Sequence, residues 1–492
     1  MRRLIAAATT VLALAAAVPV AGASRATAQA PPPLAWTPCP GGQGTPDGGE
    51  CTTVTVPLDS RHPRNGKTAG IALFRVPARD PGTRIGSLVV NPGGPGASGA
   101  QFVRDVYDLL PDELRDRFDI VGFDPRGTGA SMPVDCGDVV DTIFGLDYSP
   151  DSPEERTALV DGTKAVVGQC RRALGSNLRF VSSPDTVRDL ERIRRALGDE
   201  QLTFLGYSYG TYLGALYADR YPARVRALLL DGAIDPRLSS HDAALQQAVG
   251  FEQSLDTFFD FCATTRRCAF GGADPGAAFD ELTAAIDAAP PTTGDGRALA
   301  PGMFFVGVIK ALYDGHVSYP ELDAALAAAR DGDAAPMLSL YDQYTRRDDP
   351  ANANVLEAFW AIGCRDGRRL AKPGGFAAFE PEFAAAAPHL GVQALSLGLV
   401  CASWPAKPVA SPLPLDAKGA PPILVIGTVG DPATPVQWAH ALADELDSGV
   451  LLETDGGRHA SFVLGRLPCV DDAGVRYLVD LTVPPPGTRC SA

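Results

Sequence analysis

Short apolar runs alternate with amphipathic segments along most of the chain. The runs are rich in Val, Ile, Leu and Phe and have the composition of buried strands: Cys51–Val56, Ile71–Val76, Ser87–Val90, Phe118–Phe123, Leu202–Leu205, Val225–Leu230, Ile423–Ile426 and Val450–Glu453. Apolar residues recur at helical spacing between the later runs, over Thr186–Leu197, Thr211–Tyr221 and Val436–Leu446. Because parallel strands need crossovers that cover the sheet, this pattern predicts an α/β domain with a mostly parallel, eight-stranded sheet.

The alternation stops after residue 235. The sequence is then Ala-rich, with a helical pattern of apolar residues, to about residue 413. Apolar residues fall on one helical face in its first part, and further helices are expected over Met303–Tyr313, Pro320–Arg330 and Asn352–Cys364. We therefore predict a helical cap, residues 236–413, inserted between the sixth and seventh strands. The core then comprises residues 31–235 and 414–492.

The first thirty residues have the three parts of a secretory signal. Arg2 and Arg3 form a basic start, Leu4–Val20 is almost entirely apolar, and Ala28-Gln29-Ala30 is a small-x-small cleavage site. The alternative is an uncleaved membrane anchor. A cleaved signal predicts a secreted protein, extracellular or associated with the cell wall, with no stable membrane insertion after cleavage.

Ten cysteines are present, which for an exported chain predicts five disulfides: Cys39, Cys51, Cys136, Cys170, Cys262, Cys268, Cys364, Cys401, Cys469 and Cys490. Pairing of sequence neighbours would give short staples such as Cys39–Cys51, Cys262–Cys268 and Cys469–Cys490, although spacing alone leaves the connectivity open. Neither a CxxC nor a paired HxxxH pattern occurs, so we expect no metal site.

Composition narrows the class of partner. Hydrophobic residues make up 45% and charged residues 21%, which is ordinary for a globular protein. The chain has 58 Asp and Glu against 43 Lys and Arg, a formal net charge of −15. This acidic balance argues against nucleic acid or an anionic membrane surface as a partner.

A candidate nucleophile lies in Gly206-Tyr207-Ser208-Tyr209-Gly210, between a predicted strand and a predicted helix. This is the G-x-S-x-G pattern in the strand-to-helix context that gives it meaning. Side chains at Gly206 or Gly210 would crowd the neighbouring strand or helix. Ser208 would stand at a helix N-terminus, where the dipole favours developing negative charge.

The third strand is followed by Asn91-Pro92-Gly93-Gly94-Pro95-Gly96, whose backbone N–H groups could face a substrate oxyanion. The expected oxyanion hole combines the N–H of Tyr209 with one from this loop, Gly94 first and Gly93 second. A second loop, Asp124-Pro125-Arg126-Gly127, follows the fourth strand, and we interpret it as a turn with a buried Arg–Asp pair.

A serine nucleophile needs a base, and the base needs a carboxylate that holds its tautomer. In α/β hydrolases the chain order is Ser, then Asp or Glu, then His. Asp431 follows the seventh predicted strand and His459 the eighth, which predicts the triad Ser208, Asp431 and His459. Asp455 is a rival carboxylate on the same loop as His459.

The loops that contain Asn91, Asp124 and Ser208, together with Asp431-Pro432-Ala433-Thr434-Pro435, resemble the secreted tripeptidyl aminopeptidases of actinomycetes, which are α/β hydrolases related to prolyl aminopeptidase. The resemblance covers the chain from about Trp36 to Cys490. It implies a serine exopeptidase that releases short peptides, typically tripeptides, from a free N-terminus without a cofactor. The prolyl aminopeptidase relatives have His where Asn91 stands, which favours the tripeptidyl branch.

An aminopeptidase must bind the substrate ammonium, and Asp366 and Glu357 in the cap are the candidate carboxylates. A Cys364–Cys401 disulfide would hold that segment in place. Two other functions remain open: a secreted esterase or lipase, which uses the same triad, and a binding protein on a hydrolase scaffold. The intact Ser, Asp and His argue against the second. The oligomeric state is not predicted.

Overall fold

A single sheet organises the part of the chain that the computed structural model describes: residues 34–39, 46–265, 268–346, 349, 353–367, 372–409 and 414–491. Its ten strands are ordered β1-β2-β3-β5-β4-β6-β7-β8-β9-β10. Their bounds are β1 Thr37–Pro38, β2 Glu50–Pro57, β3 Thr68–Val76, β4 Gly86–Asn91, β5 Phe118–Phe123, β6 Leu202–Tyr207, β7 Val225–Asp231, β8 Ile423–Val429, β9 Gly449–Asp455 and β10 Arg489–Cys490. The predicted secretory signal lies outside the described residues.

The sheet begins antiparallel and continues parallel. β1, β2, β3 and β5 pair antiparallel in turn, whereas every pairing from β5 through β4 to β10 is parallel. The eight strands expected from the sequence are β2 to β9. The sequence did not indicate β1 and β10, because two-residue strands carry no periodic pattern.

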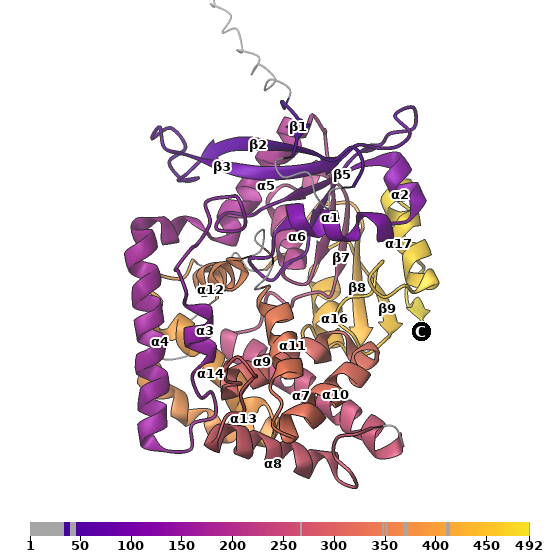
Figure 1. Ribbon diagram of the computed structural model, residues 1–492. Helices are drawn as coiled ribbons and strands as arrows, with labels where there is room; N and C mark the ends of the chain where they lie inside the picture. The colour runs from indigo at the N-terminus through magenta and orange to yellow at the C-terminus, as the bar shows by residue number, and fades with distance from the viewer. Residues whose placement is uncertain are drawn as a thin grey trace, which may run out of the picture. The chain divides into compact units, whose positions relative to one another are not determined.

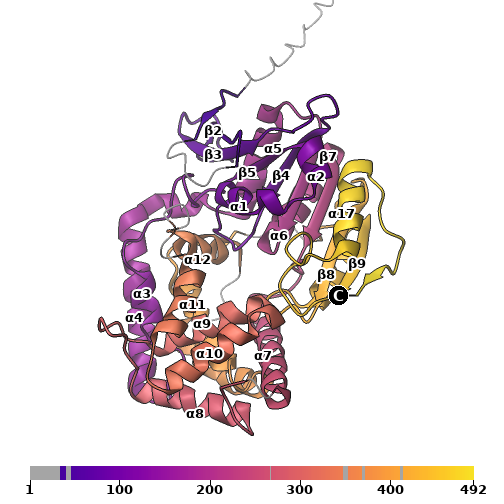
Figure 2. The same ribbon diagram turned by 45° about the vertical axis from the view of Figure 1, so that its right-hand side comes forward.

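Helices cover both faces of the parallel part (Figures 1 and 2). One apolar cluster joins the sheet to α1 (Gly99–Val106), α2 (Asp112–Arg117) and α17 (Pro468–Asp480). Another joins the opposite face to α5 (Ser183–Leu197), α6 (Tyr209–Arg220) and α16 (Val436–Glu445). The central strands β4, β5 and β6 are buried throughout, which explains their continuous apolar runs.

The helical insertion lies between β7 and β8. It contains α7 Ser240–Thr264, α8 Pro275–Ala288, α9 Pro301–Tyr313, α10 Tyr319–Arg330, α11 Ala335–Thr345, α12 Val355–Asp366, α13 Glu380–Ala386, α14 Gly391–Leu397 and α15 Leu399–Ser403. Short 3-10 turns occupy Tyr107–Leu109, Gly175–Phe180, Pro222–Arg224, Gly315–Val317 and Pro373–Ala378.

A second segment packs with this insertion. Residues of α3 (Val140–Phe144) and the long α4 (Pro153–Leu174) share one apolar cluster with α7, α9, α11 and α12. The Phe144 ring contacts Tyr341 and Trp360, and the Tyr341 hydroxyl donates a hydrogen bond to Asp141 over 2.7 Å. By their position in the chain, α3 and α4 fall within residues 31–235, the range expected for the first part of the core. Their packing assigns them to the helical block instead, because their apolar faces meet cap helices rather than the sheet.

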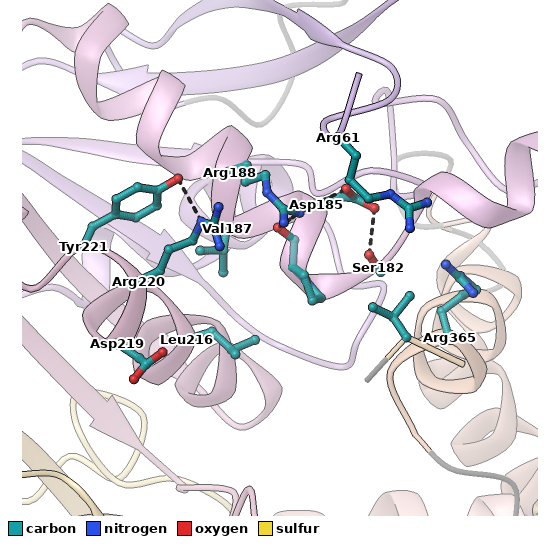
Figure 3. Close-up of a pocket in the computed structure, with 12 residues that line it drawn as sticks. Arg61, Ser182, Asp185, Val187, Arg188, Leu216, Asp219, Arg220, Tyr221 and Arg365 are labelled. Atoms are coloured by element: carbon teal, nitrogen blue, oxygen red, sulfur yellow. Dashed lines mark hydrogen bonds and ion pairs between the residues drawn. The ribbon is translucent and has the colours of Figure 1, made fainter. Parts of the chain in front are cut away.

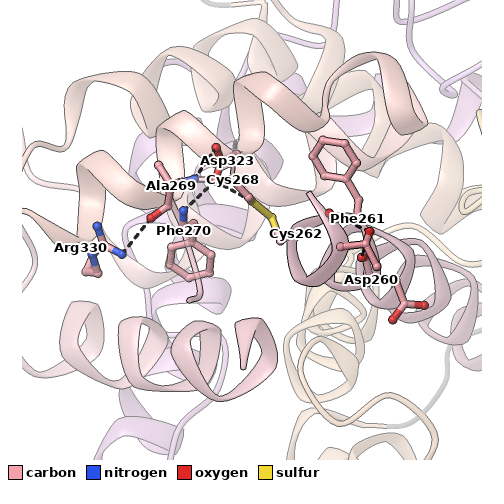
Figure 4. Close-up of a disulfide and its surroundings, with 9 residues drawn as sticks. Asp260, Phe261, Cys262, Cys268, Ala269, Phe270, Asp323 and Arg330 are labelled. Carbon is pink, nitrogen blue, oxygen red and sulfur yellow. Dashed lines mark hydrogen bonds between the residues drawn. A yellow bond between two sulfur atoms is a disulfide. The ribbon is translucent and has the colours of Figure 1, made fainter. Parts of the chain in front are cut away.

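Five disulfides join sequence neighbours: Cys39–Cys51, Cys136–Cys170, Cys262–Cys268, Cys364–Cys401 and Cys469–Cys490. This confirms the five bridges expected from the cysteine count, in the sequential pairing. Figure 4 shows the Cys262–Cys268 bridge beside Asp323, whose carboxylate accepts hydrogen bonds from the backbone N–H groups of Ala269 and Phe270. The bridge and this carboxylate together hold residues 268–270 against α7 and α10.

Among the described residues, the search for a helix with the length and apolar character of a bilayer span finds none.

Candidate active site

Ser208 occupies the sharp turn between β6 and α6. Its backbone is left-handed in φ, with φ 53° and ψ −123°, and its N–H donates to Asp231 O over 2.8 Å. A Cβ on Gly206 would lie 2.6 Å from Gly210 O, and one on Gly210 would lie 2.6 Å from Asn91 O. Only glycine fits at these two positions, so the pattern G-x-S-x-G follows from the packing of this turn.

The glycine loop after β4 packs directly against this turn. Gly93 and Gly94 have φ of +91° and +101°, and a Cβ on Gly93 would lie 2.7 Å from Tyr209 N. The Gly93 N–H donates to Asn91 Oδ1 over 3.0 Å, whereas Gly94 lines the cavity beside Ser208. Of the two loop donors expected from the sequence, Gly94 is therefore the better placed to face a substrate.

Asp431 and His459 form a hydrogen-bonded pair at the ends of β8 and β9. His459 Nδ1 lies 2.9 Å from Asp431 Oδ2 and 3.0 Å from Oδ1. The carboxylate is 3% exposed and also accepts the N–H groups of Ala433 and Thr434 and the Thr434 hydroxyl, each within 2.9 Å. These bonds fix the carboxylate, which in turn assigns the His459 proton to Nδ1. Asp455, the rival carboxylate, pairs with Arg489 at 2.7 Å.

Two residues without a role predicted from the sequence, Thr434 and Tyr313, complete this pair. Thr434 Oγ1 lies 3.2 Å from His459 Nδ1, and the ring of Tyr313 meets the imidazole edge-on at 5.3 Å between centroids. The backbone N–H of His459 donates a hydrogen bond to the backbone oxygen of Tyr313 over 2.9 Å. The last residue of α9 therefore supports the loop after β9. A polar residue three positions after Asp431 was the one sequence signal available for Thr434.

Asp231, at the end of β7, holds the far side of the same loop. Its Oδ2 accepts the N–H groups of Ser461 and Phe462 over 2.8 and 2.7 Å. Complete burial raises the pKa of the Asp231 carboxyl to about 6, although the two N–H groups act in the opposite direction. The loop that carries His459 is thus anchored at Asp231, Asp431 and Tyr313.

A cavity of about 1000 Å³ brings Ser208 and His459 to one cleft. Gly94, Pro95 and Phe102 line its core side, and α9, α11, α12 and the turn Thr293–Arg297 line its cap side. The cap side is rich in charge. Arg297 forms a two-pronged ion pair with Asp342 at 2.6 and 2.7 Å, and Lys310 pairs with Asp314 at 2.7 Å.

Asp366 and Glu357 do not line this cleft. Asp366 accepts the Tyr209 hydroxyl over 2.6 Å and the Ser183 N–H over 3.0 Å. Burial raises the pKa of Asp366 to about 6 and that of Glu357 to about 7. Val355, Leu356 and Phe359 are the residues of α12 that face the cavity. Glu357 is buried and Asp366 is engaged by Tyr209 and Ser183, and neither predicted amine-binding carboxylate is among the residues that line this cleft.

The loop after β5 makes two separate buried contacts, one with Ser98 at the start of α1 and one with α5. Asp124 accepts the Ser98 hydroxyl over 2.5 Å and the Ala130 N–H over 2.9 Å. Arg126 is fully buried and pairs with Asp189 on α5, with a second bond at 2.9 Å. The buried Arg–Asp pair expected here is present, and its carboxylate comes from α5 rather than from the loop.

Comparison with known proteins agrees with this geometry. A family model described as the alpha/beta hydrolase fold matches residues 86–465. The chain belongs to the α/β-hydrolase fold family.

Within that family, the chain is 36% identical to the serine protease Hip1 of Mycobacterium tuberculosis, over 93% of this chain and 91% of the relative. It is 34% identical to carboxylesterase B of the same organism, over 90% and 86%. It is 29% identical to the tripeptidyl aminopeptidase of Streptomyces lividans, over 94% and 86%. These relatives confirm the resemblance to the actinomycete tripeptidyl aminopeptidase group and support a serine hydrolase of the peptidase kind.

Proposed function

We propose that the chain is a secreted serine exopeptidase that releases short peptides, tripeptides in particular, from a free N-terminus. Ser208 is the nucleophile, His459 the general base and Asp431 the carboxylate that orients the base. The observation that carries this proposal is the fixed Asp431–His459 pair opening into the same cleft as the strained turn of Ser208. The export signal in the sequence and the five disulfides support secretion.

The mechanism follows from these positions. His459 takes the Ser208 hydroxyl proton as the oxygen attacks the scissile carbonyl. The N–H groups of Tyr209 and Gly94 stabilise the oxyanion, with the N-terminus of α6 adding its dipole. His459 then protonates the leaving amine, and water activated by His459 hydrolyses the acyl-enzyme. Asp431 keeps the imidazole oriented and stabilises its charged form.

The helical cap supports an exopeptidase, because α9, α11, α12 and the turn Thr293–Arg297 wall one side of the cleft. Three residues in extended conformation span about 10 Å, so a bound tripeptide reaches from Ser208 toward the acidic cap side. The carboxylates that line this side are Asp295, Asp314, Asp342 and Asp349. We propose that the ammonium partner comes from this set, in place of Asp366 and Glu357.

A panel of peptide p-nitroanilides, one to four residues long, tests the proposal. Each peptide is assayed with a free and with an acetylated N-terminus. We expect the tripeptide with a free N-terminus to give the highest kcat/KM and acetylation to lower it by at least about a hundredfold, since a carboxylate that lines the cleft loses its charged partner. Equal cleavage of acetylated peptides would exclude an aminopeptidase.

A carboxylesterase is the second candidate, because carboxylesterase B is a 34% identical relative and the same triad hydrolyses esters. Acyl esters of p-nitrophenol in the same panel distinguish the two. Efficient ester hydrolysis with no release from any free peptide anilide would favour the esterase.

The pH at which Ser208 loses its reactivity depends on the pKa of His459. Burial alone would lower the pKa of this imidazole, but the charge and hydrogen bond of Asp431 outweigh burial, so the pKa lies above the usual 6.5. His459 accepts a proton only when neutral, so reactivity falls as the pH drops through this raised pKa. We expect inactivation by phenylmethylsulfonyl fluoride, which has no amine, to have its acidic midpoint above pH 6.5. A midpoint below pH 6 would contradict the pairing with Asp431.

A further inference from the structure

A second cavity, of about 770 Å³, lies between α5, the last turns of α6 and the end of α12. It shares no lining residue with the cleft that contains Ser208. Four arginines from four separate segments line it: Arg61 in the loop after β2, Arg188 on α5, Arg220 at the end of α6 and Arg365 on α12 (Figure 3). Such convergence of guanidinium groups is the usual construction of an oxyanion site.

The carboxylates around this cavity do not balance the arginines. Asp185 and Asp219 line it. Asp185 already accepts the hydroxyls of Ser60 and Ser182, and lies 3.4 Å from Arg188.

Arg61 has only a weak contact with an acidic side chain. Arg61 reaches Asp59 only at 3.9 Å, and that carboxylate also pairs with His62 at 2.9 Å. Burial, followed by the nearby charge of Arg220, lowers the pKa of Arg188. The cavity therefore carries excess positive charge.

Of the four arginines, Arg365 points most clearly to a bound anion. It is 5% exposed, and its Nη2 donates to Arg179 O over 3.1 Å. Its Nε has no hydrogen-bond partner among the described residues. The adjacent carboxylate, Asp366, is already engaged by Tyr209 and Ser183. A buried guanidinium with an unused donor is costly unless an anion completes it.

We propose that this cavity binds a phosphate group, held by Arg365 and Arg188 with Arg61 and Arg220 at the rim. A phosphate carries a charge near −2 and three acceptor oxygens, which matches several guanidinium forks better than a single carboxylate does. The volume exceeds that of the ion alone, so the ligand is the phosphate of a larger molecule, such as a phosphate monoester. This site is independent of the proposed peptidase activity.

Isothermal titration calorimetry of the disulfide-bonded protein tests the site, with inorganic phosphate and glycerol 3-phosphate as probes. Chloride keeps the ionic strength constant. We expect both probes to bind one site, with glycerol 3-phosphate at least as tight as phosphate. Arg365→Met and Arg188→Ala should each weaken binding about tenfold, the effect of losing one charge-assisted hydrogen bond. Arg195→Ala, an exposed arginine on the same helix as Arg188, should leave it unchanged.

Arg61→Ala provides a variant that keeps the fold if loss of Arg365 prevents folding, because the Arg61 side chain is 60% exposed. We expect it to weaken phosphate binding severalfold. Absence of phosphate binding at constant ionic strength would overturn the proposal. So would equal binding by wild type and the Arg61 and Arg188 variants, or malonate binding as tightly as phosphate.

Discussion

Ser208→Ala is expected to lower kcat/KM toward a free tripeptide anilide by four to six orders of magnitude, to about the level that binding and the oxyanion hole supply alone. The hydroxyl is the atom that attacks the carbonyl in the proposed mechanism. The backbone of Ser208 already has φ 53°, and Ala adopts this conformation no less readily than Ser. The melting temperature should therefore change little.

Ser339→Ala is the matched control, because Ser339 lines the same cavity from α11. It removes an equivalent hydroxyl without touching the Asp431–His459 pair, and we expect kcat/KM to stay within about tenfold of wild type. Circular dichroism and thermal melts of both variants establish that the fold is retained. Substantial turnover by Ser208→Ala would exclude the proposed mechanism.

Asp431→Asn has the second largest expected effect, a loss of about four orders of magnitude in kcat/KM. Both carboxylate oxygens accept hydrogen bonds, from His459 Nδ1, the Ala433 and Thr434 N–H groups and the Thr434 hydroxyl. An amide can supply only one accepting oxygen, so its NH₂ must face one of these donors. The imidazole then takes the wrong tautomer, and its Nε2 can no longer accept the Ser208 proton.

Asp455→Asn is the control for this variant. Asp455 precedes His459 by four residues and pairs with Arg489 on the surface, so we expect its replacement to change kcat/KM by less than threefold. Asp431→Asn should also shift the acidic limb of Ser208 inactivation to lower pH, because the charge that raises the pKa of His459 is gone. The opposite pattern, with Asp455 essential and Asp431 dispensable, would exchange their roles.

The fold was largely predictable because the strands are buried on both faces. β4, β5 and β6 read as continuous apolar runs, and their ends were placed within a few residues. No helix was predicted over α3 or α4, and these residues fell within the expected core, residues 31–235, by their position in the chain alone. Only three-dimensional packing, such as Phe144 against Tyr341 and Trp360, shows that this part of the chain belongs with the cap.

The candidate site, like the fold, could be predicted from the sequence only in part. Gly206, Gly210 and Gly93 could be recognised because close backbone approach excludes any side chain there, and this leaves a local signature. The carboxylates that would bind the substrate amine leave no such signature in the sequence. Asp366 and Glu357 are acids on a cap helix, but the sequence does not tell which face of α12 meets the cleft. The burial of Glu357 and the hydrogen bond from the Tyr209 hydroxyl to Asp366 decide that question.

The position of α12 limits how this enzyme can be re-engineered. Asn354 at its start donates to Gly127 O over 2.8 Å, and a Cβ on Gly96 would strike the backbone of Val355 and Phe359. α12, which lines the substrate cleft, thus also supports the glycine loop after β4. Exchanging the whole helical block with that of a relative would therefore disturb the catalytic loops. A graft that keeps α12 and also α9, whose Tyr313 anchors the His459 loop, and replaces α11 would change the lining of the substrate space while these loops stay supported.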